Sequence, residues 1–137
     1  MNQNLYCLLC VSGVAILVGG CPFTFMGRAY EEDLVNGYTV WATDVMEQAE
    51  IVKKHKENTS VTVVVPATVF AYGWNDDFII AKRHPPKKDG KVDTSVIYWY
   101  IIEVASGNVH GPLSEGEFNS LGTELKVPAE LSFKTIQ

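Results

Sequence analysis

The first 27 residues of this 137-residue chain contain no charged side chain. All 11 basic and all 16 acidic residues lie at Arg28 or later. The chain therefore divides into a short apolar beginning and a polar remainder with room for one domain. Basic residues are in the minority, and a net charge of −5 argues against nucleic-acid binding through a broad basic face.

Cysteine is also scarce. The three cysteines, Cys7, Cys10 and Cys21, all lie in the apolar beginning of the chain. No disulfide and no thiol chemistry is therefore predicted after Cys21. Cys7 and Cys10 have C-x-x-C spacing, but no strand–helix redox context surrounds them. We interpret them as apolar side chains.

The motifs of common catalytic and metal sites are missing. The histidines His55, His84 and His110 have no second His or Cys at ligand spacing, and no H-E-x-x-H, G-x-S-x-G or glycine-rich phosphate loop occurs after Cys21. The sequence therefore predicts no cofactor and no metal site, and it favours a protein that is not an enzyme. The alternative is a small envelope enzyme that uses Asp76, Asp77 or the histidines.

The longest uncharged apolar run is too short for an ordinary membrane span. Residues 5–18 form a 14-residue run, whereas a spanning helix needs about 20 residues. A run of this length is typical of the apolar core of a secretory signal peptide. We expect a signal helix here. An uncleaved anchor helix and a buried core segment are the alternatives.

The run ends in Val18-Gly19-Gly20-Cys21, which resembles the bacterial lipobox. The resemblance implies cleavage before Cys21, acylation of its thiol and attachment to a membrane of the cell envelope, facing outside the cytoplasm. Two or more acyl chains anchor a protein stably. The expected organisation is a signal peptide at 1–20, a tether and start of the fold at 21–36, and a single β-rich domain at 37–137.

A β-hairpin is predicted at the centre of this domain. Residues 68–74 alternate in side-chain type, an Asn-Asp doublet follows at 75–76, and strand-forming residues return at 78–81. A two-residue loop at the doublet would place Trp74 opposite Asp77. A longer loop remains open because the doublet is not Asn-Gly. Apolar residues on both faces predict a hairpin that is buried on two sides.

The remaining elements complete a mainly β fold. A capping box formed by Ser114 and Glu117 predicts one short C-terminal helix at 115–121, ended by Gly122. Residues 45–56 fit either a helix or a strand, and we favour a strand because the neighbouring segments are strands. We therefore expect an antiparallel meander sheet, preceded by the signal helix, with further strands at 37–43, 60–65, 95–104, 109–110 and 131–136.

Two family resemblances emerge from these segments. Residues 37–41, 69–82, 100–104 and 111–118, together with the lipobox, resemble a family of short bacterial lipoproteins of unknown function, which implies no activity. Trp99-Tyr100, followed by Gly111-Pro112-Leu113-Ser114, is similar to the GYF family of adaptors for proline-rich peptides. That similarity implies a peptide groove formed by Trp99, Tyr100 and Phe118.

The functional prediction is a membrane-anchored lipoprotein whose domain binds or scaffolds an envelope component without catalysis. The membrane is the expected partner through lipid on Cys21, and an envelope protein or peptide is a possible second partner. The candidate binding residues are Trp99 and Tyr100 and, at the hairpin tip, Trp74, Asn75, Asp76 and Asp77. The alternative interpretation of the tip is a plain turn with solvated carboxylates.

Overall fold

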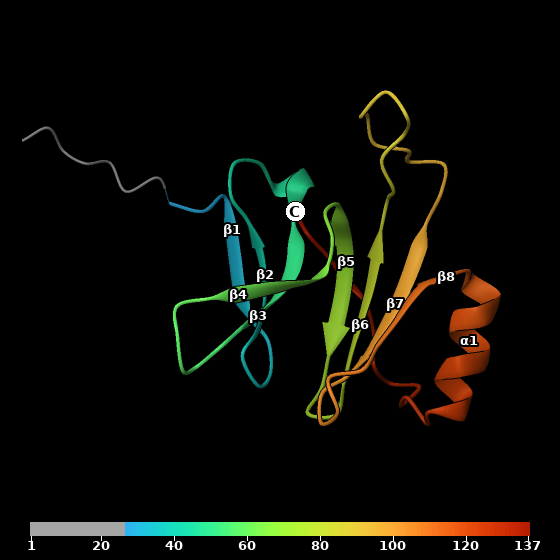
Figure 1. The fold of residues 1–137 in the computed structure, drawn as a ribbon. Helices are drawn as coiled ribbons and strands as arrows, with labels where there is room; N and C mark the ends of the chain where they lie inside the picture. Colours follow the sequence, from blue (N-terminus) through green and yellow to red (C-terminus); the bar gives the residue numbers. More distant parts are fainter. Residues whose placement is uncertain (1–26) are drawn as a thin grey trace, which may run out of the picture.

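The computed structural model describes residues 27–137 (Figure 1). The predicted signal helix and Cys7, Cys10 and Cys21 lie outside these residues. Within the described part of the chain, the structure contains two antiparallel sheets and one α-helix. This confirms a mainly β fold with one short C-terminal helix. No helix in residues 27–137 has the length and apolar character to cross a membrane.

The first sheet is a four-stranded meander in the order β1-β2-β3-β4. The segment at 45–56, which fitted either a helix or a strand, contains both a 3-10 turn, η1 (Met46–Gln48), and a strand. The acidic residues at 31–33 belong to the first strand, where they pair with 39–41. The strands are β1 (Tyr30–Asp33), β2 (Tyr38–Ala42), β3 (Glu50–Lys54) and β4 (Val61–Val65).

The second sheet has the order β8-β7-β6-β5-β9. Its first four strands in the sequence form a meander, and the last strand returns beside β5 at the sheet edge (Figure 1). Helix α1 (Glu115–Glu124) packs on the side of this sheet away from the first. The strands are β5 (Val69–Trp74), β6 (Phe78–Arg83), β7 (Tyr98–Glu103), β8 (Val109–Leu113) and β9 (Lys134–Thr135).

The main core lies between the two sheets. Val40 and Ile51 of the first sheet and Tyr72, Ile79 and Ile102 of the second belong to one cluster, and each is 0% exposed. On the opposite face of the second sheet, a further group of aromatic side chains packs under α1. The central hairpin is therefore covered on both faces, as its two-sided apolar pattern predicted.

The register of this hairpin differs from the prediction by two residues. Trp74 pairs with Ile79 rather than with Asp77, and the turn residues are Asp76 and Asp77. The cause is Asn75, whose side-chain oxygen accepts hydrogen bonds from the N–H groups of Asp77 (2.9 Å) and Phe78 (2.7 Å). An asparagine that bonds the backbone ahead of it precedes a turn rather than standing within it.

The C-terminal helix begins as predicted but ends later. Ser114 Oγ accepts a hydrogen bond from the N–H of Glu117, and the Glu117 carboxylate accepts one from the N–H of Ser114 at 2.7 Å. The capping box is therefore confirmed. Gly122 does not end the helix, which runs to Glu124. Lys126, with a φ of 60°, supplies the left-handed residue that follows the helix.

Two strand boundaries also differ from the prediction. Strand β7 begins only at Tyr98, so Val96 and Ile97 lie outside the strand and are exposed. Strand β8 extends through Gly111 and Pro112 to Leu113, although a proline was expected to close it. As the last strand on its side of the sheet, β8 tolerates a proline, because an edge strand need not use every N–H group.

Gly73 allows the C-terminal segment to cross β5 closely. A Cβ atom at this position would lie 2.1 Å from the backbone oxygen of Ser132. We expect Gly73→Ala to lower the free energy of unfolding by about 1–3 kcal/mol, because the backbone at Ser132 must move. Gly122→Ala is the matched control. Its Cβ meets only ordinary contacts at 3.9 Å or more, and alanine favours helices by about 1 kcal/mol. Urea denaturation that ranks the two variants equally would contradict this account.

Candidate functional site

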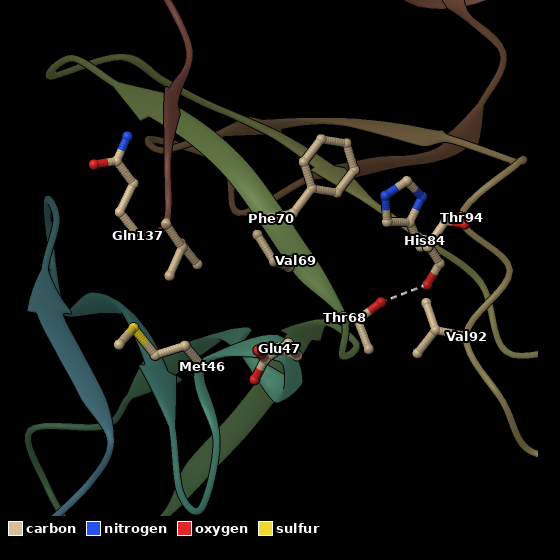
Figure 2. Close-up of a pocket in the computed structure, with 10 residues that line it drawn as sticks. Met46, Glu47, Thr68, Val69, Phe70, His84, Val92, Thr94 and Gln137 are labelled. Carbon is tan, nitrogen blue, oxygen red and sulfur yellow. Dashed lines mark hydrogen bonds between the residues drawn. The ribbon is translucent and has the colours of Figure 1, made fainter.

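A pocket of about 420 Å³ opens at one end of the domain (Figure 2). It lies where the beginning of β5, the end of β6 and η1 meet the loop after β6 and the C-terminal segment. Its lining is mostly apolar, with a few hydroxyl, imidazole, amide and carboxylate groups. The lining residues are Met46, Glu47, Thr68, Val69, Phe70, His84, Val92, Thr94, Ile136 and Gln137.

The ends of β5 and β6 fix the aromatic wall of this pocket. The Thr68 hydroxyl donates to the His84 carbonyl oxygen at 2.7 Å, and the His84 N–H donates to the Thr68 carbonyl oxygen at 3.2 Å. The rings of Phe70 and His84 stack with centroids 4.3 Å apart and planes 13° apart. The two rings therefore form a stacked aromatic pair beside the cavity (Figure 2).

The hydrogen bond at Nδ1 assigns the tautomer of neutral His84. Nδ1 lies 2.8 Å from the carbonyl oxygen of Val96, which can only accept, so Nδ1 carries the proton. The other ring nitrogen, Nε2, is then an acceptor. Within residues 27–137, no group forms a hydrogen bond with Nε2. The pocket is thus lined by a stacked aromatic pair, and His84 carries an acceptor nitrogen without a partner among residues 27–137.

The other walls come from distant parts of the chain. The N–H of Val69 donates to the Ala49 carbonyl at 2.7 Å and holds η1 against β5, while the N–H of Ile136 donates to the Phe70 carbonyl at 3.0 Å. These bonds bring Met46 and Ile136 to the lining of the same cavity. A concave, mostly apolar site with a few polar groups is suited to binding an apolar or aromatic group.

The predicted hairpin-tip residues lie at the opposite end of the domain from this pocket (Figure 1). Trp74 stacks on Tyr72 with ring centroids 5.9 Å apart. The side chain of Asn75 is occupied by the turn, and the carbonyl of Asp77 accepts the N–H of Val104 at 2.9 Å. Asp76 and Asp77 are exposed. The tip is therefore built as a turn, and its residues do not meet those of the pocket.

Trp99 and Tyr100 point to opposite faces of β7 and do not form one groove. Trp99 is 9% exposed and packs against Phe118 and Phe133, with centroids 4.8 and 5.5 Å away. Tyr100 is 4% exposed and belongs to the core between the sheets, where its ring fills the space beside Gly111. The peptide groove implied by the GYF resemblance is not present in this arrangement.

The three histidines stay apart. His55 Nε2 lies 2.9 Å from the Thr62 hydroxyl, and His110 Nε2 lies 2.8 Å from a carboxylate oxygen of Glu103. His84 is in the pocket. Between Gly27 and the C-terminus, no three His, Cys, Asp or Glu side chains are grouped so that they could hold a metal ion.

A polar cluster around Glu32 joins the two sheets. The carboxylate of Glu32 on β1 accepts a hydrogen bond from the Tyr30 hydroxyl at 2.8 Å and another from the Tyr72 hydroxyl of β5. Lys134 Nζ on β9 lies 2.6 Å from Glu32 Oε1. Burial alone would raise the pKa of Glu32, but the hydrogen bonds from Lys134, Tyr72 and Tyr30 outweigh it, and the pKa lies below its usual range. Because its polar groups bond one another, the cluster is a structural link.

Sequence reasoning missed most of the pocket. Thr68 and Phe70 were expected only as strand residues, Met46 lay in the ambiguous segment, and His84 was considered only as an isolated histidine. The lining comes from five separated stretches of the chain. No motif or spacing within any one stretch marks it as part of a site.

Comparison with known proteins identifies one family. The model of a family described as protein of unknown function (DUF3997) matches residues 35–137. No curated protein and no solved structure matches the chain. The matched residues contain the whole pocket and exclude the segment that resembles a lipobox. The expectation of a family without assigned function is confirmed, and the GYF resemblance gains no support.

Glu32 makes stability depend on pH. A carboxyl whose pKa is lowered on folding stabilises the protein above its unfolded pKa of about 4.3, and this contribution is lost as the pH falls through the folded pKa. We expect Glu32→Gln to lower the free energy of unfolding at pH 7 by about 1–3 kcal/mol. The difference from the wild type should shrink below about pH 4.

The matched control is Glu130→Gln at an exposed position, where we expect a change within about 0.5 kcal/mol. Urea denaturation of the wild type and both variants at several pH values measures these effects. A loss in Glu32→Gln that stays the same in acid would show that the charge of Glu32 does not contribute.

Proposed function

We propose, for a chain that belongs to the DUF3997 family of unknown function, that it is a membrane-anchored lipoprotein whose domain binds an apolar envelope component without catalysis. The observation that carries the binding role is the pocket beside Phe70 and His84. Pockets of this kind bury most of a small ligand against apolar walls, while a few polar groups fix its orientation. The expected ligand has an aromatic or aliphatic group and a donor for His84 Nε2.

The state of the polar groups favours binding over catalysis. The Thr68 hydroxyl already donates to a backbone carbonyl, and His84 Nδ1 already donates to Val96. A hydroxyl nucleophile needs a base within hydrogen-bond reach, and Thr68 has a carbonyl oxygen there instead. An enzyme that uses His84 Nε2 as a base is the alternative, and the binding experiment below tests it.

The anchoring part of the proposal rests on the sequence from Val18 to Cys21. If Cys21 is acylated, nine peptide units separate it from Tyr30, where β1 begins. At about 3.3–3.6 Å per residue, this stretch spans at most about 30 Å. A domain on so short a tether stays near the bilayer surface. Its ligand would then be a component found at or near that surface.

Mass spectrometry of the protein from its native membrane fraction tests the anchor. We expect a chain that begins at Cys21 and carries acyl chains, because the lipobox directs cleavage before an acylated cysteine. The Cys21→Ser variant should remain unprocessed and without lipid. A native chain that begins at Met1 without lipid would contradict the proposal and return residues 5–18 to the role of an anchor helix or core segment.

A screen of small aromatic and aliphatic compounds tests the pocket. With the ¹⁵N-labelled chain in lipid nanodiscs, we expect binders to shift the amide signals of Thr68, Phe70 and His84 and to be recovered unchanged. Val92→Trp should fill the cavity and weaken binding at least tenfold. Val109→Trp on β8 is the matched control, because the two valines are similarly exposed, at 39% and 41%.

Two results would contradict the pocket as a binding site without catalysis. Amide shifts that cluster at the hairpin tip would place binding elsewhere. Chemical conversion of a bound compound that stops in His84→Gln would support the enzyme alternative.

A further inference from the structure

Exposed apolar side chains gather at one end of the domain. Eight large hydrophobic side chains are exposed among those described, and five of them lie on two neighbouring segments at the pocket end. We call these five the apolar rim. Its members are 37–45% exposed, and they are Val45, Met46, Val92, Val96 and Ile97.

The two segments of the apolar rim belong to one surface. Val45 and Met46 lie at η1, and the other three members lie in the loop between β6 and β7 (Figure 1). Met46 and Val92 line the same pocket, and His84 in that pocket bonds the carbonyl of Val96. The rim therefore borders the pocket.

The rim also lies at the end where the chain enters the domain. The stretch before β1 runs into the first sheet at this end, whereas the turn at Asp76 and Asp77 lies at the other end (Figure 1). The tether that would follow an acylated Cys21 thus enters on the side of the exposed apolar side chains. A membrane anchored through that tether lies within reach of the rim.

The loop of the apolar rim also supplies basic groups. Lys87, Lys88 and Lys91 are exposed, and the loop is closed by a hydrogen bond from the N–H of Lys87 to the Lys91 carbonyl at 2.6 Å. The Lys87–Asp93 and Lys91–Asp89 pairs are 4.0 and 3.9 Å long. Ion pairs of this length near the surface are weak. The lysines therefore remain available to other anions.

Charge alone would not direct this end of the domain to a membrane. Asp44 and Glu47 lie beside the rim at η1, and Asp89 and Asp93 share the loop with the lysines. The apolar side chains must therefore supply most of the attraction. Lysines beside an apolar surface suit the boundary between headgroups and acyl chains, where amines meet phosphates and apolar groups enter the hydrocarbon.

We propose that the apolar rim docks onto the surface of the phospholipid bilayer that holds the anchor. This inference rests on the proposed anchoring through Cys21, and it adds an orientation. The pocket end faces the membrane, and the hairpin tip faces away from it. The pocket mouth then lies at the bilayer surface, where an apolar ligand can pass into it without crossing water.

Single fluorescent labels test the orientation. Residues 27–137 contain no cysteine, so an introduced cysteine is the only free thiol of the acylated, processed chain. Met46→Cys, Ile97→Cys and Asp76→Cys are each labelled with an environment-sensitive dye. The acylated chain is then reconstituted into vesicles of phosphatidylglycerol and phosphatidylethanolamine. We expect a blue shift and several-fold stronger quenching by a lipid-bound quencher at positions 46 and 97 than at 76.

A matched pair of variants tests the role of the apolar contact. Ile97→Asp and Val109→Asp change side chains of equal exposure, 41% each, but only Ile97 belongs to the rim. With the label at position 46, Ile97→Asp should remove most of the quenching and Val109→Asp should leave it unchanged. Equal quenching at all three label positions, or equal effects of both variants, would overturn the inference.

The outcomes separate this inference from the proposed anchor. If the chain is acylated but the labels at 46 and 97 stay in water, the anchor is supported and the docking is overturned. A native chain that mass spectrometry finds without lipid overturns the anchor. Labels at 46 and 97 that still enter the bilayer in that chain, with Cys7, Cys10 and Cys21 replaced by serine so that each label is single, support the docking. A blue shift that appears without vesicles and depends on protein concentration would show that a second copy covers the rim, and would also overturn the docking.

Discussion

The contact between the inner faces of the two sheets is the interaction on which the rest of the structure depends. Val40 and Ile51 meet Tyr72, Ile79 and Ile102 there, all without exposed surface. Apolar burial is the largest favourable contribution to folding, and here most of it requires both sheets to be present. The pocket is a consequence of this contact, because its walls come from the elements of both sheets that meet at one end.

Polar links fix how the sheets lie against each other. Glu32 reaches from β1 to Tyr72 on β5 and Lys134 on β9, and Val69 bonds the carbonyl of Ala49 at the start of β5. These links join residues far apart in the sequence. They hold η1 and the C-terminal segment beside the Phe70 and His84 rings, so the shape of the pocket depends on the relative position of the sheets.

Local features of the sequence predicted local structure well. The capping box at Ser114 and Glu117 marked the start of α1, because both of its hydrogen bonds lie within four residues. The alternating pattern marked β5 for the same reason. The hairpin register was wrong because it depended on whether Asn75 stands in the turn or before it. Gly122 was a poor indicator of the helix end, because Lys126 supplies the left-handed conformation instead.

The sequence by itself determined a mainly β domain, the start of its helix and the apolar character of both faces of the central hairpin. These properties follow from patterns in which interacting residues are neighbours. Only the tertiary structure decided that the strands form two sheets, and that Thr68, Phe70 and His84 share a pocket with Met46 and Ile136. Such contacts join positions tens of residues apart, and no local pattern encodes which surfaces will meet.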